Sequence, residues 1–383
     1  MTSTVRGRRA APRSVAYPVL LFLAALDAAG YSVIGPIVPV ISRTTGAGPA
    51  LIGALVATFP LGILIGFPIA GRMIQRRSPE RTLVASLVLV ALGCGGFVFS
   101  SELPAYMLSR FLMGIGSGGI WMGVAFATLE RWPDQGYLCM SRVFAAYSVG
   151  GLVGPALGAI GGVRGPFLAY LALLGVGLIL VPVMGSPPER RPFRSDRSAL
   201  RLPGFWLASA AILFVVLALG VIEGVLPLHF AGRLRQEEIA ALYVGMSVIV
   251  GVGAAAAGRL RPWPVVLAAM ASIVGGLSIV GATDSISLWI GLLALAGLGI
   301  GLGNTGAIGI LLEAVPADRI MTAMVVWSQL GIAGYLAGPL VGGSVAEVLG
   351  FAAVGLVPAA AAFGVLAVFV WTPRSGSSAR RAP

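Results

Sequence analysis

The stretch FLMGIGSGGIWMGVAFATLERWP at residues 111–133 has a second copy later in the chain, LAGLGIGLGNTGAIGILLEAVP at residues 295–316. Small residues recur wherever membrane helices pack closely, so matching glycines alone can arise by chance. Here a glutamate and a proline at the helix end repeat with the same spacing as the glycines. An offset of 183 pairs Gly114 with Gly297, Gly116 with Gly299, Gly118 with Gly301, Glu130 with Glu313 and Pro133 with Pro316. The pattern indicates a duplicated unit.

A second match extends the duplication to the next predicted helix. An offset of 184 pairs Gly150, Gly154, Pro155 and Gly158 with Gly334, Gly338, Pro339 and Gly342. Between the copies lies GSPPERRPFRSDRSALRLP, residues 185–203, a polar stretch rich in proline and arginine. Such a composition is typical of a linker. The sequence therefore predicts a half over 1–184, a linker over 185–203 and a half over 204–383.

The composition places most of the chain in lipid. It is 57% hydrophobic and only 10% charged, with a mean hydropathy of +0.96, whereas soluble domains average about 25% charged residues. The net charge of +12 would suggest nucleic-acid binding in a soluble protein. The arginines fall between apolar spans, so membrane orientation explains them and we expect no nucleic-acid partner.

No soluble-enzyme motif is present. Cys94, Cys139 and His229 show no metal-ligand spacing. We therefore expect no enzymatic activity, no catalytic residue, no metal site and no cofactor.

Twelve apolar stretches are long enough to cross a bilayer, which takes about 20 residues in a helix. The first, from Ala16, is longer than the apolar core of a signal peptide, so we expect it to be retained. The predicted spans are 15–40, 49–71, 82–101, 104–128, 139–162, 165–184, 204–230, 239–259, 263–281, 286–312, 320–346 and 350–371. They predict an all-α integral membrane protein with six transmembrane helices in each half.

The arginines set the orientation. Twenty-one lie in the termini and loops of one side, four (Arg43, Arg164, Arg233 and Arg235) lie on the other, and Arg110 lies within a span. Because positive residues concentrate on the cytoplasmic side, we expect both termini in the cytoplasm and a multi-pass protein of the inner, cytoplasmic cell membrane.

Several segments resemble signatures of the major facilitator superfamily, over nearly the whole chain. The turn Gly71-Arg72-Met73-Ile74-Gln75-Arg76-Arg77-Ser78-Pro79-Glu80-Arg81 resembles the loop motif G-x-L-a-D-r-x-G-r-r. Gln75 stands where the family has aspartate and Ser78 where it has glycine. The resemblance implies a latch between the halves near the start of the eleventh helix, and uncharged Gln75 should weaken it.

Three helices carry further resemblances. Arg110-Phe111-Leu112-Met113-Gly114-Ile115-Gly116 is similar to R-x-x-q-G-x-g. Ser141, Gly150, Gly154, Pro155, Gly158 and Ala159 are similar to the antiporter motif G-x8-G-x3-G-P-x2-G-G, and Gly30, Pro36 and Pro39 to a motif of twelve-helix drug:H⁺ antiporters. The resemblance implies the major facilitator fold and alternating access around a midplane cavity. The expected gating and interface residues are Arg72, Gln75, Arg76, Glu130, Gly150, Gly154, Pro155 and Glu313. We expect Glu130 to pair with Arg72 or Arg76, and Glu313 with Arg259 or Arg261.

Ionisable residues inside the predicted spans are few, and each costs several kcal/mol there unless it is paired or hydrated. Asp27 lies near the midplane with Tyr31 one turn on, and Glu223 lies in the outer half of its span. Because low dielectric favours a neutral carboxyl, both are candidates for exchanging the coupling proton. Alternatively, Asp27 could bond a helix neighbour and Glu223 could contact His229 or water, for structure only. Arg110 either extends to the interface or faces the cavity beside an acid.

The remaining cavity candidates combine apolar and aromatic side chains with few amides. Arg110 shares one helical stripe with Met113, Ser117 and Trp121. Further candidates are Asn304, Thr305, Trp327, Ser328, Gln329 and Tyr335, in addition to Tyr31. A sugar site would need several more amides and carboxylates to satisfy its hydroxyls. The composition favours a small amphipathic or apolar substrate.

The function expected from the sequence is proton-coupled efflux of a drug or metabolite by a monomeric secondary active transporter, of the kind associated with drug resistance. Its expected partners are the small-molecule substrate, protons and the lipid bilayer. Two alternatives stay open. One is a facilitator-type transporter of sugars, amino acids or other metabolites, whose flux would survive loss of the proton gradient. The other is a membrane receptor or scaffold, which would move no compound.

Overall fold

The computed structural model describes residues 14–132, 135–185, 197–258, 260–316 and 319–371. Across these ranges the chain is helical and contains no strand. Most of the predicted linker, together with Arg259, lies outside the described residues.

The helices follow one another with short connections. They are α1 (Ala16–Ser32), η1 (Gly35–Ile37), α2 (Val38–Thr45), α3 (Pro49–Arg76), α4 (Pro79–Phe99), α5 (Leu103–Arg131), α6 (Gly136–Gly158), α7 (Arg164–Val183), η3 (Arg197–Arg201), α8 (Pro203–Gly224), α9 (Leu226–Phe230), α10 (Gln236–Ala257), α11 (Pro262–Leu277), η4 (Val280–Ala282), α12 (Ile286–Ala314), α13 (Ile320–Leu349), η5 (Phe351–Ala353) and α14 (Leu356–Trp371).

Within the described ranges, eleven helical segments are long and apolar enough to cross a membrane. The remaining predicted span, 139–162, corresponds to α6, a 23-residue helix that is not among the eleven. The first span is one segment, Ala16–Thr45, but its helix is broken at η1. Pro36 and Pro39 explain the break, because proline has no N–H for the helical ladder. α2 then ends at Thr45, and the next residue, Gly46, has a φ of 69°, a left-handed conformation that favours glycine.

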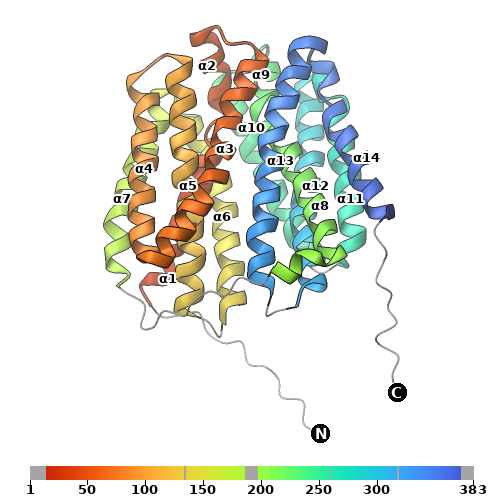
Figure 1. The fold of residues 1–383 in the computed structure, drawn as a ribbon. Coiled ribbons are helices and arrows are strands. Elements are labelled where there is room, and N and C mark those ends of the chain that lie inside the picture. The colour runs from red at the N-terminus through yellow and green to blue at the C-terminus, as the bar shows by residue number, and fades with distance from the viewer. Residues whose placement is uncertain (1–13, 133–134, 186–196, 259, 317–318, 372–383) are drawn as a thin grey trace, which may run out of the picture.

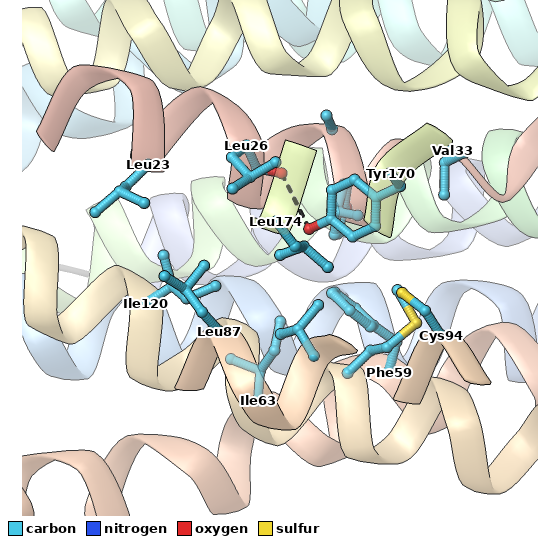
Figure 2. Close-up of a cluster of buried hydrophobic side chains, with 14 of the residues drawn as sticks. Leu23, Leu26, Val33, Phe59, Ile63, Leu87, Cys94, Ile120, Tyr170 and Leu174 are labelled. Atoms are coloured by element: carbon cyan, nitrogen blue, oxygen red, sulfur yellow. Dashed lines mark hydrogen bonds between the residues drawn. The ribbon is translucent and has the colours of Figure 1, made fainter. Parts of the chain in front are cut away.

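The helices form one bundle, with α4 and α7 at one edge and α11 and α14 at the opposite edge (Figure 1). We call the end where α1 begins and α14 ends the base, and the end that carries α2 and α9 the top. The buried apolar side chains form two clusters, one from residues 16–184 together with Tyr335 and one from residues 199–365. We call the parts of the chain that supply these two clusters, residues 16–184 and 199–371, the two halves. Figure 2 shows part of the first cluster, where the hydroxyl of Tyr170 on α7 donates to the carbonyl of Leu26 on α1 at 3.1 Å.

The paired glycines occupy equivalent places in the two clusters. Gly114 and Gly118 of α5 pack against α3, and Gly297 and Gly301 of α12 pack against α10. Gly116 of α5 packs against α4, as Gly299 of α12 packs against α11. Each leaves no room for a Cβ between neighbouring backbones, which is the usual role of small residues between membrane helices. The repeat in sequence is therefore also a repeat in helix packing.

The same correspondence extends to α1 and α8. Gly150 of α6 lies against Ala25 of α1, and Gly334 of α13 lies against Leu213 of α8. These contacts align α1 with α8 at an offset of 188 positions, which places Val215 at the position equivalent to Asp27.

Candidate functional site

Among the described residues, three acidic or basic side chains are buried inside the bundle, each on a different helix. Asp27 on α1 is 3% exposed, Arg110 on α5 is 0% exposed and Glu223 on α8 is 5% exposed. All three side chains are therefore out of contact with bulk solvent, and neighbouring groups of the protein must supply their hydrogen bonds and balance their charge. The sequence candidates for proton exchange and Arg110 therefore all lie in the interior of the structure.

Arg110 reaches α1 and α3. Its Nη1 donates a hydrogen bond to the carbonyl of Gly30 at 3.2 Å, and its guanidinium carbon lies 4.1 Å from the centre of the Phe59 ring. Such a cation–π contact offsets part of the cost of burying the charge. Among the described residues, Nε and Nη2 have no hydrogen-bond partner. Arg110 thus points inward and retains unused donors.

Asp27 has a neutral partner. The hydroxyl of Ser117 on α5 is within hydrogen-bonding reach of its carboxyl group. Tyr147 and Tyr170 are also electrostatic neighbours of Asp27. A hydroxyl can donate to a carboxylate or accept from a carboxylic acid, so this environment accommodates both protonation states.

Glu223 is held by a residue of another helix. The hydroxyl of Tyr335 on α13 donates to Glu223 Oε2 at 2.7 Å. His229, the alternative partner considered from the sequence, instead contacts the carbonyl of Thr283 at 3.0 Å. Glu223 therefore belongs to the interior cluster.

Tyr335 joins the two halves of the bundle. Its ring lies 4.5 Å from the ring of Tyr31 on α1, centre to centre, at 36°. Tyr31 in turn contacts Phe59 edge-on at 5.8 Å. Glu223 and Tyr335 are both electrostatic neighbours of Arg110. Tyr170 is an electrostatic neighbour of both Asp27 and Arg110, and Tyr147 of both Asp27 and Glu223. One cation and two carboxyl groups therefore share one aromatic environment.

The other predicted cavity residues divide between this cluster and the surrounding packing. Trp121 lies 5.4 Å from the Tyr147 ring and so borders the cluster. Met113 is buried beside Gly93 of α4. Trp327 donates from Nε1 to the carbonyl of Ala208 at 3.0 Å. Two further predicted cavity residues, Asn304 and Gln329, are half-buried.

At the base, the predicted gating residues lie mostly at the surface. Arg72, Gln75, Arg76 and Glu313 are exposed and Glu130 is half-buried. A salt bridge at this end joins Arg131 to Glu80 at 2.8 Å.

The predicted interface residues of α6 lie against α1. Gly150 and Gly154 pack on its backbone, and Pro155 is buried inside α6. Next to Gly150, the carbonyl of Gly151 accepts a hydrogen bond from the hydroxyl of Ser247 on α10 at 3.3 Å. Helix α6 therefore contacts both halves.

Two polar contacts between the halves at the top were not predicted. The carboxylate of Glu347, at the end of α13, accepts a hydrogen bond from the backbone N–H of Ala50 in the first turn of α3 at 3.1 Å. Gln236, at the start of α10, donates to the carbonyls of Gly158 and Gly162 at 2.7 and 3.0 Å and accepts from the N–H of Gly162 at 2.9 Å. No local sequence pattern could predict these pairs, because the partners lie 297 and 74–78 positions apart in the chain. Together they join the two halves at the top.

Known proteins resemble this chain in sequence and fold. The human synaptic vesicular amine transporter is 24% identical over 323 residues, covering 78% of this chain and 62% of that protein. The transporter YcaD of Salmonella arizonae, described as uncharacterised, is 26% identical over 223 residues, or 56% of each chain. The chain thus spans about three fifths of the length of the amine transporters it matches.

Solved structures agree on the fold. A bacterial homologue of the human lysosomal transporter Spinster superposes with a TM-score of 0.72 and 15% identity, over 94% of this chain and 95% of that one. The nucleoside transporter NupG superposes with a TM-score of 0.73 and 14% identity, over 93% and 99%. The sequence profile of the Major Facilitator Superfamily matches residues 20–283, more than half of the chain. The chain therefore belongs to the major facilitator superfamily of membrane transporters.

Proposed function

We propose that this protein is a proton-coupled secondary active transporter that exports small amphipathic or apolar compounds by alternating access. The observation that carries the proposal is the interior cluster of Asp27, Arg110 and Glu223. A structural salt bridge would need one acid for one base. A second acid, paired with neutral hydroxyls, is what a proton carrier needs.

The charge balance of the cluster explains the coupling. With both carboxyl groups ionised the cluster carries one net negative charge, and one bound proton neutralises it. Net charge inside the membrane is costly, so the proton-loaded cluster is the form that can be closed off from water. Release of the proton on one side then favours an open state or the arrival of a substrate.

Asp27 suits the exchanging role better than Glu223. Its identified side-chain partner is the hydroxyl of Ser117, which reorients at little cost. Glu223 is fixed by the 2.7 Å bond from Tyr335 and lies near Arg110. In this proposal Asp27 exchanges the proton, and Glu223 transmits the change in charge to the other half.

The proposed motion is a rocking of halves 1–184 and 204–383 about the cluster, with linker 185–203 and both termini in the cytoplasm. The repeat in packing supports this division, because each half buries its own apolar cluster. The contacts of Glu347 and Gln236 close the top in the present state. They would break when the protein opens toward that side.

The substrate class follows from the surroundings of the cluster. Tyr31, Phe59, Tyr335, Tyr147 and Trp121 are aromatic, and such surfaces bind apolar bodies with few specific polar contacts. The relation to a protein named as an amine transporter is compatible with a compound that joins an apolar body to one polar group. We place the protein in the cytoplasmic membrane and expect it to act as a monomer.

The test is transport by purified protein in liposomes under an imposed pH gradient. We expect a fluorescent amphipathic compound to move against its own gradient with wild type, and Asp27→Asn to abolish the proton-driven component. The matched control is Asp284→Asn, which removes an exposed carboxylate 3.9 Å from Arg233. Flux that is indifferent to the pH gradient would favour a facilitator, and absence of flux for every compound would favour a receptor or scaffold.

A further inference from the structure

A surface groove opens at the base, between the start of α4 and the end of α7. Its volume is about 440 Å³, and Arg77, Arg81 and Glu80 line its polar part. It lies away from the interior cluster, on the outside of the bundle, where α4 and α7 run side by side (Figure 1). The transport mechanism proposed above does not use it.

Among the described residues that line the groove, two arginines stand against one acid. Arg77 and Arg81 are both exposed. Glu80 does not neutralise them, because Arg131 binds it at 2.8 Å with both side chains mostly buried, 16% and 7% exposed. Guanidinium groups bind phosphate through paired N–H donors. Two arginines lining one groove are therefore a suitable phosphate partner.

The rest of the groove is apolar. Val84 and Ala85 of α4 line one wall, and Val181 and Pro182 of α7 line the other. The apolar surface continues along both helices beyond the groove, with Val88 43% exposed on α4 and Ile179 72% exposed on α7. In a spanning bundle such side chains face acyl chains. The groove thus leads from a cationic site into the hydrocarbon region.

From this geometry we propose that the groove binds one anionic phospholipid. Its phosphate lies on Arg77 and Arg81, and an acyl chain lies along Val84, Ala85 and Val181. Basic pockets between membrane helices recognise lipid head groups in this manner, and negative lipids are attracted to nearby arginines. A soluble phosphate would leave the apolar walls uncovered, so the lipid is the occupant that fits both parts.

Spin-labelled lipids test the proposal on the full-length protein in liposomes. The measurement is the fraction of label immobilised by the protein, for phosphatidylglycerol against phosphatidylcholine carrying the same chain. We expect wild type to prefer phosphatidylglycerol, and Arg77→Gln with Arg81→Gln to lower that preference by about tenfold. The matched control is Arg201→Gln with Arg261→Gln, which removes two exposed arginines at the base of the other half. It should retain the preference.

A second variant separates a built site from simple surface charge. Ala85→Trp fills the apolar part while leaving both arginines in place, so it should reduce the immobilised fraction even though the charge is unchanged. It also tests the groove if the double variant does not fold. Equal loss in the control pair, no effect of Ala85→Trp, or displacement of the lipid by millimolar inorganic phosphate would each overturn the proposal.

Discussion

The contact between Glu347 and the first turn of α3 gives a quantitative prediction about the conformational equilibrium. The carboxylate accepts one backbone hydrogen bond at 3.1 Å and lies at the positive end of a helix. A hydrogen bond of this kind contributes about 0.5 to 1.5 kcal/mol net, and a charge at an exposed helix N-terminus about 0.3 to 1 kcal/mol. The contact should therefore favour the state closed at the top by about 1 to 2 kcal/mol, a factor of roughly 5 to 30 in population.

Two substitutions of Glu347 separate the contribution of the hydrogen bond from that of the charge. Glu347→Ala removes both terms and should increase the population open at the top by roughly 5- to 30-fold. Glu347→Gln keeps an acceptor oxygen and loses the charge, so its effect should be smaller, about two- to fivefold. The order wild type, Glu347→Gln, Glu347→Ala is the signature of the proposed contact.

Pulsed electron paramagnetic resonance between labels at the top measures these populations. Thr44→Cys and Ser287→Cys place exposed labels on opposite halves, in a background with the buried Cys94 and Cys139 replaced by alanine. The control is Glu237→Gln, an exposed acid that pairs with Arg235 inside one half at 3.1 Å. An unchanged distance distribution in Glu347→Ala, or an equal shift in the control, would refute the reasoning.

Other perturbations test the interior cluster and the helix packing. Tyr335→Phe removes the hydrogen-bond donor to Glu223 but keeps the aromatic ring against Tyr31. Because an unpaired buried carboxylate costs about 1 to 3 kcal/mol, we expect proton-driven flux in liposomes to fall at least fivefold. Gly150→Val places a side chain against the α1 backbone and should destabilise the protein by about 1 to 3 kcal/mol, visible as a lower melting temperature in detergent. Gly151→Val, where nothing lies within 4 Å of a new Cβ, should melt like wild type.

The sequence predicted the helical membrane fold because lipid imposes strong local constraints. Long apolar runs, prolines and the register of repeated glycines can all be recognised without knowing tertiary contacts. The glycines of 111–133 and 295–316 correctly indicated equivalent helices, since each glycine marks a position where two backbones approach. The break of the first span at η1 was not predicted, although Pro36 and Pro39 supplied its signal.

The burial of the candidate site residues could be predicted from the sequence, but their contacts could not. Asp27, Arg110 and Glu223 stand out because ionisable groups are rare in apolar spans. Their partners do not stand out: Tyr335 is 112 positions from Glu223. A hydroxyl on a helix is compatible with many roles, and only packing selects one. The top contacts of Glu347 and Gln236 were missed for the same reason.

The ionisable residues of the cluster do not follow the repeat of the helices on which they lie. At the positions equivalent to Asp27 and Arg110, the second half has Val215 and Leu293, which are 1% and 2% exposed. Duplicated packing therefore does not require ionisable groups at these depths, because one copy places apolar residues there. Each buried charge costs several kcal/mol, and the valine and leucine show how that cost is avoided. The acid and the base present in the first half, of which Arg110 is an electrostatic neighbour of Glu223, therefore support the proposed function, which needs charge inside the membrane.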